Sequence, residues 1–247
     1  MKNPSLILAT DLDGTFLGGT DKQCKVLYDW ISAHENHILI FVTGRDLPFI
    51  RQLVKSPGMP RPHYIIADIG TSVFDGATFE PVLDVESSIA TLWDNGADRI
   101  AALLDNEPSL KLQDAPFRYR RSYYYDPHTF SSDLLSKVEE TGYDWILSAD
   151  RFFDVLPRGV SKGPTLLRLL EYLSLPRDNV LVAGDTLNDL SLFETRLKGV
   201  AVGGAEEPLL ESIQNLSNVY RSSEPGAAGI WDALKHFRFS TIKETQL

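Results

Sequence analysis

Two aspartates separated by one residue, Asp11 and Asp13, follow a short apolar run in the stretch ATDLDGTFLGG, residues 9–19. Neighbouring carboxylates repel each other and are costly to desolvate, so their place at the end of a buried segment needs a reason. One interpretation is a surface turn, because Asp-Gly is a common turn dipeptide. The other is a site where a metal ion neutralises the acids and a phosphate group binds.

Two more polar clusters follow apolar runs later in the chain. Thr43-Gly44-Arg45 ends one such run, and Gly184–Asp189, with the sequence GDTLND, ends another. In open parallel sheets, ligands bind outside the carboxyl ends of the strands. A turn explains any one of these clusters, but it explains poorly why all three stand at the same end of successive predicted strands. The pattern therefore favours a binding site.

So many acids in one place need a cation. A ligand set made only of oxygen atoms indicates Mg²⁺, which typically acts on phosphate. The five histidines have no metal-like spacing, so zinc is not expected. Lys162 stands at the start of a leucine-rich helical pattern, where a helix N-terminus favours an anion. A solvated surface lysine is the ordinary interpretation of Lys162 alone. The other parts make it a candidate phosphate ligand, together with the hydroxyl of Thr43.

The elements that must position these residues form an alternating pattern. One amphipathic helix is predicted to start near Asp21 and another after Lys162. The runs that predict buried parallel strands are Leu6–Thr10, Ile38–Thr43, Tyr64–Ala67, Val180–Ala183 and Val200–Val202. Alternation of strands and helices predicts an α/β fold with a Rossmann-like parallel-sheet core.

The middle of the chain breaks this alternation. Helical patterns near Ser87–Leu104 and Ser131–Thr141 surround longer, aromatic-rich strand patterns, which lie at Phe117–Tyr125, Asp144–Ser148 and Arg151–Leu156. Two helices with clustered strands predict a separate, smaller α+β domain inserted into the larger one. We therefore expect a core domain built from residues 1–79 and 159–247, with the insertion at residues 80–158.

The composition limits the classes of function. The chain has 247 residues, 43% of them hydrophobic, and a net charge of −10, which argues against a general nucleic-acid binder. No apolar stretch reaches the roughly 20 residues that span a bilayer, and no signal-peptide pattern is visible. The single cysteine, Cys24, cannot form an internal disulfide. We expect a cytoplasmic protein that acts on a small molecule and contacts neither nucleic acid nor membrane, with a monomer as the default.

The polar clusters resemble, in order, the four motifs of the haloacid dehalogenase (HAD) superfamily of phosphatases, and the insertion resembles that superfamily's C2-type cap. The residues that carry the four motifs are Asp11–Thr15, Val42–Arg45, Lys162 and Gly184–Asp189. The chain is also similar to the sucrose-phosphate phosphatase family. That likeness lies in Phe153–Pro157 before Ser161-Lys162-Gly163, in Ser122–Pro127, in Leu192–Thr195 and in Ala228–Ile230.

The resemblance implies the roles of the acids. Asp11 would be the nucleophile that forms an aspartyl-phosphate, which splits one difficult step into two. Asp13 would protonate the leaving oxygen and then deprotonate the attacking water. Mg²⁺ would be bound by Asp11, the backbone carbonyl of Asp13 and Asp185, and would offset the crowded negative charge.

The same resemblance implies a set of phosphate-binding residues. Thr43 and Lys162 would hold phosphate oxygens, and Asn188 would also contact the phosphate. Asp189 would orient Lys162 or a metal-bound water. In the cap, the stretch FRYRRSYYYD, residues 117–126, combines arginines and tyrosines that suit sugar hydroxyls. Ordinary strand packing is the simpler interpretation for any single residue of that stretch.

The resemblance implies a Mg²⁺-dependent phosphatase that acts on a sugar phosphate, and sucrose-6-phosphate is the first candidate substrate. The same fold would serve mannosylfructose-phosphate, a glycosylglycerate phosphate or a hexose phosphate. A phosphomutase would share the aspartyl-phosphate but return the phosphoryl group to a sugar. A non-catalytic sugar-phosphate sensor is expected to lack the nucleophile or the acid, and the presence of both Asp11 and Asp13 argues against it.

Overall fold

The larger sheet of the molecule has seven strands, and the computed structural model describes residues 4–240 of the chain. Its strands are β1 (Leu6–Thr10), β2 (His37–Val42), β3 (Tyr64–Ala67), β4 (Ser72–Asp75), β9 (Val180–Gly184), β10 (Lys198–Gly203) and β11 (Val219–Pro225). The order across the sheet is β11-β10-β9-β1-β2-β3-β4, and every neighbouring pair is parallel except β3 and β4. The predicted α/β class and the parallel core are confirmed.

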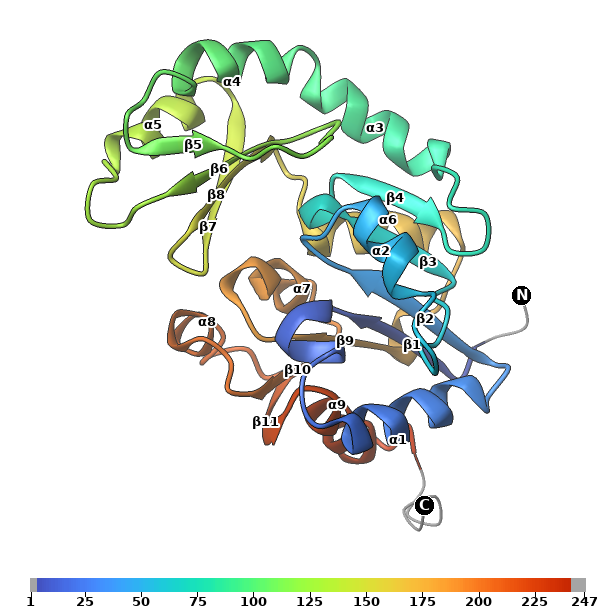
Figure 1. Cartoon of the computed structure of the whole chain (residues 1–247). Coiled ribbons are helices and arrows are strands. Elements are labelled where there is room, and N and C mark those ends of the chain that lie inside the picture. The colour runs from blue at the N-terminus through green and yellow to red at the C-terminus, as the bar shows by residue number, and fades with distance from the viewer. Residues whose placement is uncertain (1–3, 241–247) are drawn as a thin grey trace.

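Helices cover both faces of this sheet (Figure 1). One face carries α1 (Asp21–Ser32), α2 (Leu47–Leu53) and α9 (Gly226–His236), and the other carries α6 (Lys162–Tyr172), α7 (Leu190–Glu194) and α8 (Glu207–Ser212). Within β1, Leu6 and Leu8 pack on the first face while Ile7 and Ala9 pack on the second. A strand buried on both sides reads as a continuous apolar run, which is why the sequence revealed it.

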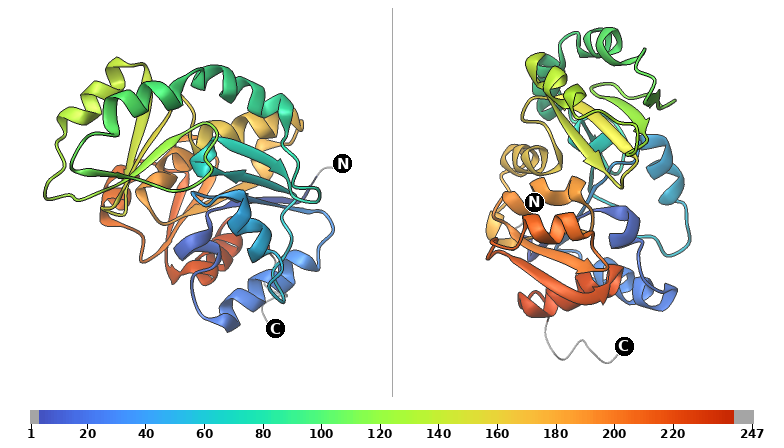
Figure 2. Two further views of the ribbon diagram at one scale, coloured as in Figure 1. Left: turned by 45° about the horizontal axis from the view of Figure 1, so that its top comes forward. Right: turned by 90° about the vertical axis from the view of Figure 1, so that its left-hand side faces the viewer.

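The smaller sheet is antiparallel and lies over the core at the carboxyl ends of its strands (Figure 2). It consists of β5 (Leu110–Leu112), β6 (Arg121–Tyr125), β7 (Tyr143–Ser148) and β8 (Phe152–Pro157), in the order β5-β6-β8-β7. With α3 (Leu83–Trp93), α4 (Gly96–Leu104) and α5 (Asp133–Glu140) it forms a unit that we name the cap. The cap confirms the expected inserted α+β unit. Its predicted bounds, residues 80–158, stay a prediction.

The two faces of the cap sheet have different tasks. Tyr123 and Phe153 face the helices and join an apolar cluster with side chains of α3, α4 and α5. Their neighbours Tyr124, Phe152 and Asp154 line a cavity instead. The alternation follows from the two-residue period of a strand. One face of the cap is therefore a hydrophobic core and the other is a wall of the site.

Several predicted bounds in the cap were wrong. The helix expected at Ser87–Leu104 is two helices, because Asp94 adopts a φ of 44° and ends α3. The strand expected from Phe117 begins only at Arg121, and β5 was not predicted. In the core, β4 and β11 were also missed. β4 is a four-residue antiparallel edge strand, and β11 is largely exposed, so neither carries the apolar run of a buried strand.

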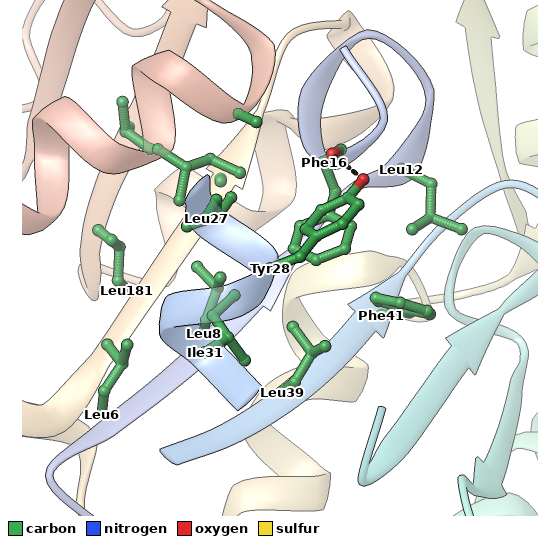
Figure 3. Close-up of a cluster of buried hydrophobic side chains, with 14 of the residues drawn as sticks. Leu6, Leu8, Leu12, Phe16, Leu27, Tyr28, Ile31, Leu39, Phe41 and Leu181 are labelled. Carbon is green, nitrogen blue, oxygen red and sulfur yellow. Dashed lines mark hydrogen bonds between the residues drawn. The ribbon is translucent and has the colours of Figure 1, made fainter. Parts of the chain in front are cut away.

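The turn that follows β1 is fixed by its own apolar side chains. Leu12 and Phe16 are fully buried, and the Phe16 ring stacks on Tyr28 of α1 at a centroid distance of 4.7 Å (Figure 3). The Tyr28 hydroxyl donates a hydrogen bond to the carbonyl oxygen of Phe16 at 2.8 Å. Between Leu12 and Phe16 in the chain, Gly14 adopts a φ of 76°. These contacts hold the two aspartates of the turn at the edge of the sheet.

None of the helices in residues 4–240 is long and apolar enough to cross a membrane.

Candidate active site

A buried lysine lies at the centre of the site. Lys162, the first residue of α6, is fully buried, and its ammonium nitrogen donates to three oxygen atoms. These are Oδ1 of Asp11 at 2.7 Å, Oδ1 of Asn188 at 2.6 Å and Oδ1 of Asp189 at 2.6 Å. The four residues come from three segments that are far apart in sequence. The structure therefore brings the first, third and fourth motifs together at the carboxyl ends of β1 and β9.

The approach of α6 to this edge depends on two glycines. A Cβ atom at Gly70 would lie 2.4 Å from the backbone of Ser161, and one at Gly163 would lie 1.9 Å from the carbonyl oxygen of Ser191. The Thr165 hydroxyl also donates to the carbonyl oxygen of Gly70 at 2.8 Å. Because no side chain intervenes, the start of α6 packs directly on its neighbours. This close packing places Lys162 within reach of the acids.

Asp189 has its oxygens occupied by hydrogen-bond donors. While Oδ1 accepts from Lys162, Oδ2 accepts from the backbone N–H groups of Asp185 at 3.0 Å and Thr186 at 3.1 Å. This arrangement stiffens the loop after β9. The bond from Lys162 also fixes the position of the ammonium group, and the role expected of Asp189 in the reaction stays a prediction.

Asp185 is held by a residue that the sequence analysis did not single out. The Thr15 hydroxyl donates to Oδ1 of Asp185 at 2.6 Å across the turn after β1. Thr15 is fully buried. Its hydroxyl within the first motif, four residues after Asp11, is the sequence signal that could have found it. Gly14 lies against the same carboxylate, since a Cβ atom there would be 2.1 Å from Oδ2. The turn after β1 therefore positions an acid of the fourth motif.

The charges of the site do not balance. Oxygen atoms of Asp11, Asp185 and Asp189 lie within 4.8 Å of one another, and Lys162 forms ion pairs with Asp11 and Asp189. Burial raises the pKa of Asp11 to about 8 against the lowering effect of Lys162, and it raises the pKa of Asp185 to about 6. Burial acts to lower the pKa of Lys162, but Asp11 and Asp189 together raise it above its ordinary value.

This donor set fits Mg²⁺. Its ligand atoms are all oxygens, and with all three carboxylates ionised the three acids and Lys162 leave two negative charges, which a divalent cation would compensate. Asp189 already accepts three hydrogen bonds, so Asp11 and Asp185 are the carboxylates best able to bind the ion. They are also the side-chain ligands expected from the sequence, and their assignment to the metal stays a prediction. The expected contribution of Asp13, through its backbone carbonyl, stays a prediction.

The carboxylate of Asp13 points to a different partner. Arg45 binds it with two hydrogen bonds, Nε to Oδ2 at 2.8 Å and Nη2 to Oδ1 at 2.9 Å. The Asp13 hydrogen bond raises the pKa of Arg45 above its ordinary value. The two side chains are 51% and 49% exposed, so the ion pair contributes little to stability and can open. Arg45 belongs to the second motif, but its sequence context alone indicates no role for it.

Thr43 is fully buried at the end of β2. Its hydroxyl accepts a hydrogen bond from the backbone N–H of Arg45 at 3.1 Å, so this oxygen shapes the loop 43–45. The same hydroxyl keeps its own proton for an acceptor such as a phosphate oxygen. The phosphate role expected of Thr43 and Asn188 stays a prediction.

A cavity of about 580 Å³ lies between these residues and the cap. Asp11, Asp13, Arg45 and Asn188 line it from the core. Its cap residues are Gln113, Phe117, Arg120, Tyr124, Ser148, Ala149, Arg151, Phe152 and Asp154. The volume is in the range of small-molecule sites, and the cap contributes both aromatic and hydrogen-bonding side chains. Three members of the expected stretch 117–126, namely Phe117, Arg120 and Tyr124, reach the cavity.

Comparison with known proteins places this site in a family. The sequence model described as sucrose-6F-phosphate phosphohydrolase matches residues 4–238. A glucosylglycerol-phosphate synthase from Pseudomonas anguilliseptica is 41% identical over 235 residues, which are 95% of this chain and 31% of that protein. A mannosylfructose-phosphate phosphatase from Agrobacterium fabrum is 26% identical over 243 residues, covering 95% of this chain and 97% of that protein. The chain therefore spans about a third of the first relative and nearly all of the second.

Solved structures agree with the sequence comparison. The sucrose-phosphatase of Synechocystis sp. PCC6803, determined in complex with sucrose and phosphate, superposes with a TM-score of 0.87 at 28% identity. The match covers 96% of this chain and 100% of that one. A haloacid dehalogenase-like hydrolase from Bacillus subtilis, yhjK, shares the fold, with a TM-score of 0.67 and 18% identity over 97% of this chain and 94% of that one. The chain belongs to the sucrose-6F-phosphate phosphohydrolase family.

Proposed function

We propose that this chain is a Mg²⁺-dependent phosphatase that hydrolyses the phosphate monoester of a small glycoside. The observation that carries the proposal is the position of Asp11. Its carboxylate lines a cavity of about 580 Å³ under the cap, bonded to the buried Lys162 and grouped with Asp185. A carboxylate next to a buried cation and a cluster of oxygen ligands is equipped to attack phosphorus.

The reaction proceeds in two steps. In the first, an oxygen of Asp11 forms a bond to phosphorus, the bond to the sugar oxygen breaks, and Asp13 donates its proton to the departing alcohol. In the second, water attacks the aspartyl-phosphate, Asp13 accepts a proton from that water, and phosphate leaves as Asp11 is restored. Because both Asp13 oxygens accept from Arg45 in this structure, the ion pair opens when Asp13 acts.

Asp11 and Asp185 would hold the metal, with the backbone carbonyl of Asp13 as a third ligand. When bound, Mg²⁺ supplies compensation for the negative charge of the phosphoryl group. Thr15 orients Asp185 through its 2.6 Å hydrogen bond, and Asp189 orients Lys162. Lys162, Thr43 and Asn188 hold phosphate oxygens. Asp185, Asp189 and Lys162 already have hydrogen-bond partners in this structure, and Lys162 turns one of its three N–H donors to a phosphate oxygen when the substrate binds.

As the substrate we place glucosylglycerol phosphate first, so that glucosylglycerol is the leaving alcohol. The relative named for that compound is 41% identical over this region, against 26% for the mannosylfructose-phosphate phosphatase and 28% for the solved sucrose-phosphatase. The matched region is 31% of the synthase, which leaves most of that protein for another activity. Sucrose-6-phosphate is the second candidate, supported by the family match over residues 4–238 and by the TM-score of 0.87.

A substrate panel tests the proposal. Phosphate release is measured at matched subsaturating concentrations from glucosylglycerol phosphate, sucrose-6-phosphate, mannosylfructose-phosphate, glucose-6-phosphate and fructose-6-phosphate. We expect the glycoside phosphates to be cleaved far better than the hexose phosphates, since binding energy from the part remote from the phosphate can raise turnover. Hexose phosphates matching every glycoside phosphate would replace this proposal with a broad hexose-phosphate phosphatase. Phosphoryl transfer to sugar without release of phosphate would indicate a phosphomutase.

A further inference from the structure

A buried arginine of the cap reaches into the core. Arg120 directly precedes β6, and its side chain is only 4% exposed. Within the cap, its Nη1 donates to Oδ1 of Asp154 at 3.0 Å, and the Ser122 hydroxyl donates to the same oxygen. The guanidinium also lies 3.6 Å from the centroid of the Phe117 ring. These contacts hold the side chain in one orientation.

The other end of the guanidinium contacts two parts of the core. Nη2 donates to the carbonyl oxygen of Gly44 at 3.0 Å and lies 3.8 Å from Oδ1 of Asp68. Gly44 stands between Thr43 and Arg45, the residue that holds Asp13. One cap side chain is therefore bonded to the backbone of the loop that carries two residues of the site.

Asp68 belongs to a strained segment. Asp68 and Ile69 have φ values of 54° and 58°, a region that β-branched residues rarely adopt, and Gly70 follows at 99°. The backbone N–H groups of Asp68 and Ile69 donate to the carbonyl oxygens of Arg45 at 3.1 Å and Thr43 at 3.0 Å. Segment 68–70 therefore supports the loop 43–45 on one side.

The same segment supports Lys162 on its other side. Gly70 packs against the backbone of Ser161 and Lys162, so a Cβ atom there would lie within 2.7 Å of the Lys162 backbone nitrogen. Arg120 thus touches a unit of the core that supports both the loop 43–45 and the first residue of α6. Strain in such a unit persists only where the surroundings hold it in place.

We propose that Arg120 is a positioning residue, which sets the loop 43–45 and the segment 68–70 when the cap is seated on the core. The proposal rests on the phosphatase function proposed above. With the cap in place, the buried charge of Arg120 is shared between Asp154 of the cap and Asp68 of the core. A cap displaced from the core would leave the Gly44 carbonyl and the Asp68 carboxylate without the Arg120 donor, and the loop 43–45 would lose this support. Seating of the cap and completion of the phosphate site are thereby coupled.

Arg120 also lines the cavity, so a direct contact with sugar is the competing explanation. The two explanations differ in their kinetics. A positioning role acts on the phosphoryl group of every substrate, including a small aryl phosphate that does not fill the cap. A sugar contact acts on glycoside phosphates alone and appears mainly in KM.

The kinetic experiment compares Arg120→Met and Arg120→Lys with Arg121→Met. Arg121 is a matched control, because it is the next residue and pairs with Asp105 and Tyr123 within the cap. We expect Arg120→Met to lower kcat about 10- to 100-fold on both the preferred glycoside phosphate and p-nitrophenyl phosphate, as a small misplacement of reacting groups does. Arg120→Lys should recover part of that loss, and Arg121→Met should stay within about twofold of the wild type. A rise in KM for the glycoside phosphate alone would overturn the proposal.

A second readout does not depend on activity. Hydrogen–deuterium exchange of the amides of Arg45, Asp68 and Ile69 should be faster in Arg120→Met than in wild type, while the amides of β9 are unchanged. If Arg120→Met fails to fold, as denaturant unfolding would reveal, Arg120→Lys and Asp154→Asn carry the same comparison. Unchanged exchange in the folded variants overturns the positioning role. Absence of phosphatase activity in wild type, with the expected exchange pattern, would instead reject the proposed function and leave the cap–core coupling standing.

Discussion

The ammonium nitrogen of Lys162 lies 2.7 Å from Oδ1 of Asp11, although the two residues are 151 positions apart in the chain. Both side chains are buried, at 0% and 7% exposure. Burying such a pair is costly, and the cost is offset here because Asn188 and Asp189 complete the hydrogen bonds of the ammonium group. The contact joins the turn after β1 to the start of α6, which follows the cap in the chain. The site is therefore assembled only when the two parts of the core, before and after the cap, pack together.

Asp11→Asn should abolish turnover and leave the fold intact. The amide keeps the shape of the side chain and its carbonyl oxygen can still accept from Lys162, but it cannot act as a nucleophile. We expect phosphate release to fall at least about 10³-fold. Asp29→Asn is the matched control, since Asp29 is an exposed helix residue paired with Lys25. Near-normal phosphate release by folded Asp11→Asn would sink the covalent mechanism.

Asp13→Asn should slow phosphoryl transfer most for substrates whose leaving group must be protonated. An alkyl leaving group such as a sugar requires protonation, whereas p-nitrophenolate leaves without it. In single-turnover measurements, the phosphoryl-transfer step should therefore lose much more rate with the glycoside phosphate than with p-nitrophenyl phosphate. Equal losses with both substrates would show that Asp13 is not the acid.

The Mg²⁺ concentration needed for activity should depend on Asp185 and on the Thr15 hydroxyl that orients it. Activity should vanish in chelator and return with Mg²⁺, and Asp185→Ala should abolish activity or greatly raise the Mg²⁺ requirement. Thr15→Val removes only the hydroxyl that orients Asp185, so the half-saturating Mg²⁺ concentration should rise about 10- to 100-fold. Thr91→Val is the control, because Thr91 is exposed on α3 and its hydroxyl bonds within that helix, to the carbonyl oxygen of Ser87. Full activity after exhaustive chelation contradicts the assigned metal site.

Gly14→Ala should disable the site through one methyl group. The new Cβ would lie 2.1 Å from Oδ2 of Asp185, and the φ of 76° is strained for alanine by about 1–2 kcal/mol. Gly142→Ala is a matched control, since its φ is 89° and nothing lies within 4 Å of the added atom. We expect both variants to lose stability in denaturant unfolding, and Gly14→Ala alone to lose at least about tenfold in activity through the displaced carboxylate. Equal activity in the two variants would show that the clash relaxes without moving Asp185.

Local pattern determined most of the core. β1 and β3 were predicted with the bounds that the structure shows, because strands buried on both faces are continuous apolar runs. The turn with Asp11 and Asp13, and Lys162 at the start of α6, followed from residue types and spacing. β5 and β11 were missed because they are short or largely exposed, so their pairing comes from neighbouring strands and leaves no apolar signature in the sequence.

Tertiary structure decided which groups meet. Sequence placed Asp13 beside Asp11, but only the fold turns its carboxylate to Arg45, 32 residues away. The bond from Thr15 to Asp185 spans 170 residues, and the reach of Arg120 to Gly44 spans 76. Spacing along the chain sets which face a side chain occupies, over one strand or a few helical turns. Contacts between distant segments depend on how whole elements pack, and that packing is a property of the folded chain as a unit.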